Sequence, residues 1–160
     1  MVLSIFIDEL GEWWDLLEGN DIEELQEALK GKNSCTISDI DADFPFKLEG
    51  EILLSDLEEI ANKVNEIDDE GLDDVFKAVL EYLGAYSFDE AYNTVISGEY
   101  DFNCDVNDDE DLGYYLVDEG IMFNNVPEEV KNYLDYEAIG RDYRFNTSSC
   151  CTNYGFIELY

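Results

Sequence analysis

The sequence predicts an α+β protein made of three small domains that cover residues 1–50, 51–98 and 99–160. Two observations predict this class. Short β-prone runs bounded by turn residues occur near both ends of the chain, whereas the middle holds apolar residues at helical spacing. A chain of 160 residues is long enough for one domain, or for two or three small ones that share interfaces.

The first domain is predicted to be a small sheet covered by one helix, in the order β-α-β-β. Val2–Ile7 is β-prone and predicts the first strand. Asn20 is placed to cap the helix with Glu23 at its third position, and Gly31 lies just past the helix end. The other expected features are a buried stripe of Ile22, Leu25 and Leu29, and strands at Cys35–Ile40 and at Phe44–Leu48, the second opening around Pro45.

The middle domain is predicted to be a bundle of three short helices. Two S-x-x-E capping boxes, Ser55 with Glu58 and Ser87 with Glu90, predict helix starts. The chain breaks at Asp68–Gly71 and near Gly84. The apolar faces expected from the spacing are Leu57, Ile60, Ala61 and Val64, then Leu72, Val75, Phe76, Val79, Leu80 and Leu83, then Phe88, Ala91, Tyr92 and Val95.

The third domain is predicted to combine strands and helices. Glu99–Cys104 alternates and predicts a strand, and Asn107–Asp111 introduces a helix that should stop at Gly120. Two closing strands are expected at Tyr143–Cys151 and Tyr154–Leu159. The apolar side of the helix is expected to hold Leu112, Tyr115 and Leu116.

Val126–Tyr143 is predicted to open with a further helix. Pro127 suits a first helical position, where its missing N–H is no loss, and Glu128 and Glu129 follow where the helix dipole favours acids. The alternative is a two-helix corner whose tyrosines only fill a core. The helix interpretation places Val130, Tyr133, Leu134 and Ile139 on an apolar face, and Asp135, Glu137 and Asp142 in solvent.

The net charge of −33 is the most unusual property of the chain. The three predicted domains carry −10, −11 and −12, so the charge is spread over the chain and is not confined to a tail. Because 46% of the residues are hydrophobic, the charge does not indicate disorder. Such a protein repels nucleic acid and anionic membranes and favours strongly basic partners. Its charge equals that of roughly 16 base pairs of duplex DNA, at about one charge per 1.7 Å.

Catalytic and metal chemistry find little support in the sequence. The chain has no histidine, which excludes Ser-His-Asp and Cys-His catalysis, and its cysteines form no C-x-x-C pair. The EF-hand-like openings at Asp39, Asp101 and Asp105 lack the glycine and glutamate that a calcium loop needs. A carboxylate-only nuclease stays formally open, but eight scattered basic residues make no patch that holds phosphates. We therefore expect no enzyme activity, no metal and no cofactor.

The N-terminus and the apolar runs predict a cytoplasmic protein. MVLSIFIDEL lacks a basic segment and turns acidic within eight residues, which is not typical of a signal peptide. No apolar run reaches membrane-spanning length.

Residues 132–142 resemble the C-terminal signature of the ArdA-type antirestriction proteins, a run of the form NY-(I/L)-DY-x-A-x-GRD after a helix that begins with VP. LGYYLVDEG, residues 112–120, resembles the YY-(I/V)-EE-G segment that precedes this signature. The order of a tryptophan, an acidic helix and an L/F-P-F strand is similar to the family's N-terminal domain, although the family's loop with Y-N-E-G is nearly absent here. The matching signature residues are Asn132, Tyr133, Leu134, Asp135, Tyr136, Ala138, Gly140, Arg141 and Asp142.

The resemblance implies an elongated homodimer of three-domain chains, encoded by phages, plasmids or transposons and acting in the bacterial cytoplasm. It implies a DNA mimic that binds the methyltransferase core of type I restriction–modification enzymes, without binding nucleic acid itself. Tyr133, Tyr136 and Arg141 are expected to have structural roles, with Arg141 paired to Asp142 or Asp135. The carboxylates expected to replace phosphates are Asp109, Glu110, Asp111, Asp118, Glu119, Glu128, Glu129, Asp135 and Glu137, with Glu23, Glu24, Glu27, Glu58, Glu59, Asp73 and Asp74 on earlier helices.

Two alternatives stay open on the sequence. One is an acidic mimic that inhibits another defence or DNA-handling enzyme, such as a CRISPR effector, because charge alone does not identify the groove. The other is an acidic chaperone or adaptor for basic proteins, which needs no duplex geometry.

Overall fold

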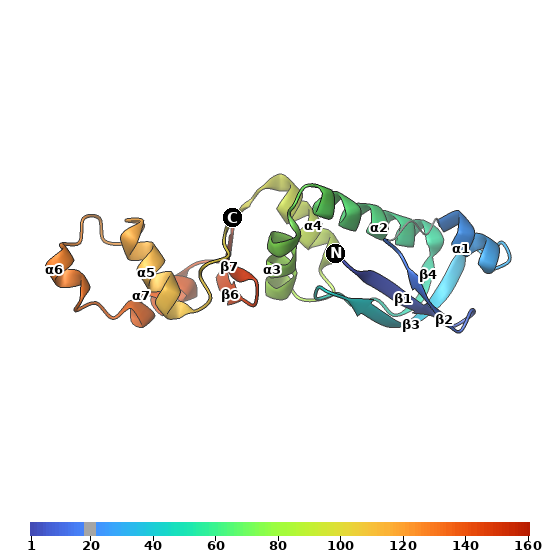
Figure 1. Ribbon diagram of the computed structural model, residues 1–160, viewed down its shortest axis with the longest axis horizontal. Helices are drawn as coiled ribbons and strands as arrows, with labels where there is room; N and C mark the ends of the chain where they lie inside the picture. Colours follow the sequence, from blue (N-terminus) through green and yellow to red (C-terminus); the bar gives the residue numbers. More distant parts are fainter. Residues whose placement is uncertain (18–21) are drawn as a thin grey trace. The chain divides into compact units, whose positions relative to one another are not determined.

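The computed structural model confirms the α+β class, with a four-stranded sheet, a helical middle and a small C-terminal sheet (Figure 1). It describes residues 1–17 and 22–160. Contacts divide the chain into two compact units, Met1–Tyr92, called unit 1, and Asn93–Tyr160, called unit 2. The division into three domains stays a prediction.

The sheet of unit 1 is antiparallel, in the order β2-β1-β3-β4. One of its two inner strands, β1 (Leu3–Ile7), buries alternate residues, as expected for a strand with one face on a core. The neighbouring strands are β2 (Glu12–Asp15), β3 (Ser34–Ala42) and β4 (Gly50–Leu53), and the helix between β2 and β3 is α1 (Ile22–Ala28).

Strand β2 was not predicted, so the observed order is β-β-α-β-β. Gly11 has φ 68° and its N–H bonds to the Ile7 carbonyl, which closes a tight hairpin between β1 and β2. Trp13 and Trp14 then pair with Phe6 and Ile5. The turn between β1 and β2 is so short that the sequence pattern does not show them as two separate strands.

The predicted strand at Phe44–Leu48 is wrong, and the fourth strand is β4. Pro45 has no N–H to give to a ladder. Phe44 instead packs on Phe46 and Phe76, with ring centroids 5.8 and 5.9 Å away, and the segment joins an aromatic core. The helix cap predicted at Asn20 lies outside the described residues. Leu25 and Leu29 are buried as predicted.

The three predicted helices of the middle segment are confirmed as α2 (Leu54–Asp69), α3 (Asp73–Leu83) and α4 (Phe88–Ser97). The Ser55–Glu58 capping box is wrong, because strand β4 passes directly into α2. The helix begins one residue before Ser55, and the Leu54 N–H bonds to the Asn33 carbonyl. The Ser87 hydroxyl donates to the Leu83 carbonyl. The apolar faces meet around Leu57, Val64, Ile67, Phe76 and Leu80, all fully buried.

Unit 2 has an antiparallel sheet in the order β5-β7-β6, formed by β5 (Tyr100–Asn103), β7 (Gly155–Leu159) and β6 (Ser149–Thr152). Its helices are α5 (Asp109–Asp118), α6 (Glu128–Lys131) and α7 (Tyr136–Asn146). The core around Leu112, Leu116 and Phe156 joins the inner side of α5 to the sheet.

Two predictions for unit 2 are wrong. The stretch from Tyr143 continues α7 to Asn146, so the first closing strand starts only at Ser149. The Val126–Tyr143 stretch forms two helices, and Val130 and Tyr133 are 44% and 88% exposed within the chain instead of lying on one buried face. Asp135 begins a new helix by capping it, and this interrupts the continuous helical spacing.

Candidate functional site

The signature segment forms a corner between α6 and α7. Its fourth residue, Asp135, is the N-cap of α7, and the Asp135 side chain accepts a hydrogen bond of 3.0 Å from the Ala138 N–H. The carboxylate is exposed, so it combines a local structural role with a place on the acidic surface.

Helices α5 and α7 cross at two glycines. A Cβ added to Gly140 would overlap the Asp109 carbonyl oxygen and lie 2.9 Å from the Gly113 nitrogen. A Cβ added to Gly113 would overlap the Tyr136 carbonyl oxygen. Both obstacles are backbone, which cannot turn aside as a flexible side chain can. The glycine of the signature is therefore required by the close approach of the two helices.

An ion pair reinforces the same crossing. The Arg144 guanidinium donates to both carboxylate oxygens of Asp109, at 2.8 and 2.9 Å. Both side chains are mostly buried, and the hydrogen bond from Arg144 lowers the pKa of Asp109. The pair was not predicted, because 35 residues separate its members and no local spacing reveals it.

We expect Asp109→Asn to lower the free energy of unfolding by about 1–2 kcal/mol, since the guanidinium loses its charged partner. A double-mutant cycle with Arg144→Met, measured by urea unfolding, should give a coupling of about 1 kcal/mol. The lowered pKa of Asp109 makes this stabilisation complete above the unfolded pKa of about 3.9, and it is lost as the pH falls through the folded value. Glu110→Gln, at the exposed neighbouring position, is the control and should leave the unfolding energy within about 0.5 kcal/mol.

Two tyrosines hold the end of unit 2. The Tyr143 hydroxyl donates to Glu158 at 2.9 Å, and burial together with this carboxylate raises the pKa of Tyr143 to about 12. The Tyr160 hydroxyl donates to Asp101 on β5. These bonds tie α7 and the chain end to the sheet.

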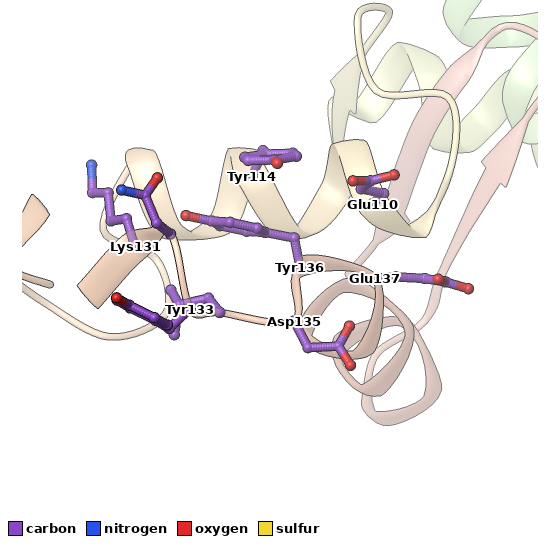
Figure 2. Close-up of a pocket in the computed structure, with 9 residues that line it drawn as sticks. Glu110, Tyr114, Lys131, Tyr133, Asp135, Tyr136 and Glu137 are labelled. Atoms are coloured by element: carbon purple, nitrogen blue, oxygen red, sulfur yellow. The ribbon is translucent and has the colours of Figure 1, made fainter. Parts of the chain in front are cut away.

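A polar hollow of about 540 Å³ lies between α5 and the corner (Figure 2). The rings of Tyr114 and Tyr136 stack in it, with centroids 3.9 Å apart and an interplanar angle of 20°. In Figure 2, Glu110 and Glu137 lie on the opposite side of this ring pair from Lys131. The complete lining is Glu110, Tyr114, Lys131, Asn132, Tyr133, Leu134, Asp135, Tyr136 and Glu137.

A second hollow of about 620 Å³, called here the apolar hollow, adjoins the first and shares Tyr133, Leu134 and Asp135 with its lining. Phe123 and Val130 contribute to it and are 54% and 44% exposed. Phe123 and Asn125 have φ of 57° and 61°, a backbone region that non-glycine residues seldom adopt. The lining residues include Met122, Phe123, Val126, Pro127, Val130, Leu134, Ala138 and Ile139.

The predicted carboxylates of unit 2 fall into two groups. Asp109 is paired with Arg144, whereas Asp118 and Glu128 both pair with Lys131, at 3.0 and 2.9 Å. Hydrogen bonds to these two carboxylates raise the pKa of Lys131, and Glu128 has the larger effect. Asp111 is half-buried, and its carboxylate accepts from the Asn107 N–H. The exposed carboxylates that remain are Glu110, Glu119, Glu129, Asp135 and Glu137.

The predicted carboxylates of unit 1 lie on three helices. Glu59 pairs with Lys63, which also contacts Asp89, at 2.6 and 2.8 Å. Asp73, in the first turn of α3, is half-buried. The exposed members are Glu23, Glu24 and Glu27 on α1, Glu58 on α2 and Asp74 on α3.

Arg141 has a different environment from Arg144. Its guanidinium lies 3.7 Å from Asp142, one of the two partners predicted for it, and both side chains are substantially exposed. Such a pair contributes little to stability. Among the signature residues, Gly140 and Asp135 therefore have the clear structural roles, and the Tyr133 ring is open to solvent.

The exposed carboxylates of the predicted set lie on helices or at helix ends, and such a surface attracts cations. Within the described residues, no group of three or more histidine, cysteine or acidic side chains is placed to hold a metal ion. Residues 1–17 and 22–160 also contain no helix long and apolar enough to cross a membrane.

Comparison with known families gives a match over most of the chain. A family model described as "Antirestriction protein (ArdA)" matches residues 9–158, which is nearly the whole chain. The search of curated proteins found no match.

Proposed function

The chain belongs to the ArdA family of antirestriction proteins, and from this premise we propose that it inhibits type I restriction–modification enzymes by mimicking DNA. Its exposed carboxylates would replace phosphates in the groove of the methyltransferase core, in the cytoplasm of a bacterial host. The net charge of −33, together with the exposed carboxylates on helices of both units, carries this proposal.

The carboxylates best suited to replace phosphates are those that are exposed on helices or at helix ends. A carboxylate already paired within the chain offers less charge to a partner, because its own cation screens it. This argument favours Glu110, Glu119, Glu129 and Glu137 in unit 2, and Glu24, Glu27, Glu58 and Asp74 in unit 1, over Asp109, Asp118, Glu128 and Glu59.

Competition with DNA tests the proposal directly. A type I enzyme bound to labelled duplex is titrated with this protein at about 50 and 200 mM salt. We expect displacement near stoichiometry at low salt and an affinity that falls steeply as salt rises, since ions are released from the basic groove. Failure to displace DNA from type I enzymes of several specificities, at both salts, would contradict the proposal. A polybasic protein serves as control, because broad binding to it would favour the chaperone or adaptor alternative.

The family premise also supports a homodimer, and the apolar hollow is the surface we propose for its interface. Its exposed apolar side chains Phe123 and Val130 are expected to be covered when two copies meet. Because each copy is strongly acidic, dimerisation should strengthen with salt, opposite in sign to binding of a basic enzyme.

Val130→Asp should shift the protein towards monomer by about tenfold or more in dissociation constant, measured by sedimentation equilibrium, because it places a charge in the interface. Ile96→Asp is the matched control, since Ile96 is an equally exposed apolar residue outside the lining of this hollow. Equal effects of the two changes would place the interface elsewhere.

A further inference from the structure

We infer that the polar hollow of unit 2 is an acceptor site for an arginine side chain of a basic protein partner. The inference rests on the proposed function, which supplies a basic groove as the partner, and it adds the residue type that docks at this place.

The hollow combines open aromatic faces with carboxylates. Tyr114 and Tyr133 are 45% and 88% exposed, and Tyr114 stacks on Tyr136. The lining also includes Glu110, Asp135 and Glu137, three acidic residues that are exposed. A guanidinium stacks on aromatic rings and forms paired hydrogen bonds with carboxylates, so both halves of the lining match its chemistry.

Lys131 does not cancel these charges. Its ammonium is bound to Asp118 and Glu128, which are not part of the lining. Glu110 and Glu137 lie on the opposite side of the ring pair from it (Figure 2). The lining therefore remains acidic, which repels a phosphate or any other anion and favours a cation.

The protein already uses the same combination for one of its own cations. In unit 1 the Lys63 ammonium lies 5.2 Å from the centroid of the Tyr92 ring and pairs with Glu59 and Asp89. In unit 2 an aromatic ring pair and acidic residues both line an open hollow. Arginine is favoured over lysine there, because a planar guanidinium stacks on a flat ring pair and is more weakly hydrated than an ammonium.

The test uses the full chain and three short peptides, Ac-Gly-Xaa-Gly-NH₂, where Xaa is arginine, lysine or the neutral isostere citrulline. Binding is followed by NMR shifts of backbone amides at about 150 mM salt, which screens unspecific attraction. We expect the arginine peptide to shift the amides of Tyr114, Asn132, Tyr133 and Glu137 in a saturable manner. The lysine peptide should bind about threefold more weakly, and citrulline should produce no saturable shift.

The variant Glu110→Gln/Glu137→Gln should weaken arginine binding about tenfold, and Tyr133→Ala about threefold. Glu119→Gln/Glu129→Gln removes the same charge outside the lining and should change it less than twofold. The inference is overturned if citrulline binds as arginine does, if shifts spread evenly over the acidic helices, or if the two double variants behave alike. Failure of native protein to displace DNA would instead overturn the proposed function, since the peptide titration is read without any enzyme.

Discussion

Gly140→Ala is expected to lower the free energy of unfolding of unit 2 by about 3 kcal/mol. The added methyl group would occupy the position of the Asp109 backbone, so α5 and α7 would have to separate. Separation would also break the Arg144–Asp109 pair and expose the core around Leu112 and Leu116. Urea unfolding followed by NMR amide signals of α5 and α7 measures the loss. Both tryptophans, Trp13 and Trp14, lie in unit 1, so their fluorescence reports that unit separately.

Asp142→Ala is the matched control for Gly140→Ala. It lies in the same helix, its side chain is exposed, and its ion pair with Arg141 is long at 3.7 Å. We expect a change within about 0.5 kcal/mol. Gly113→Ala should repeat the loss, because its obstacle is the Tyr136 backbone. Near-native stability of both alanine variants would show that the helices do not need this close approach.

The largest functional effect is expected from reversing three exposed charges of unit 2 together, Glu110→Lys, Glu119→Lys and Glu129→Lys. Competition with DNA at a type I enzyme should weaken by about 100-fold at low salt, because three attractive contacts become repulsive. The plot of log affinity against log salt should also become shallower, its slope losing about 3 in magnitude, one for each lost phosphate substitute. Single reversals should change affinity only severalfold, since the field comes from many charges.

Two controls separate the position of the charges from their number. The matching reversal in unit 1, Glu24→Lys, Glu27→Lys and Glu58→Lys, changes the net charge equally. Circular dichroism of each variant checks that the fold is retained. If the unit 2 triple variant competes as well as the native protein, the carboxylates of this surface do not face the groove. Equal losses from both triple variants would indicate that both units contact the enzyme.

The sequence was informative wherever a structural rule acts over a few neighbouring residues. Helical spacing correctly predicted α3, and Leu112 and Leu116 on the inner side of α5. The signature in residues 132–142 predicted the family that the match over residues 9–158 shows. Local rules failed where two signals competed. Pro45 and two flanking phenylalanines were interpreted as a strand, and continuous apolar spacing around Val130 hid the helix that Asp135 starts.

The sequence by itself determined the charge, its even spread, the α+β class and the family, because these follow from composition and from short-range patterns. Only the tertiary structure decided which carboxylates form ion pairs with a cation of the same chain. Arg144 reaches Asp109 across 35 residues, and Lys131 reaches Asp118 from a different helix. It also decided why Gly140 must be glycine, since the obstacle is the backbone of α5. Contacts between residues that are distant in the sequence depend on how whole helices pack. The pattern of neighbouring residues in the chain does not predict them.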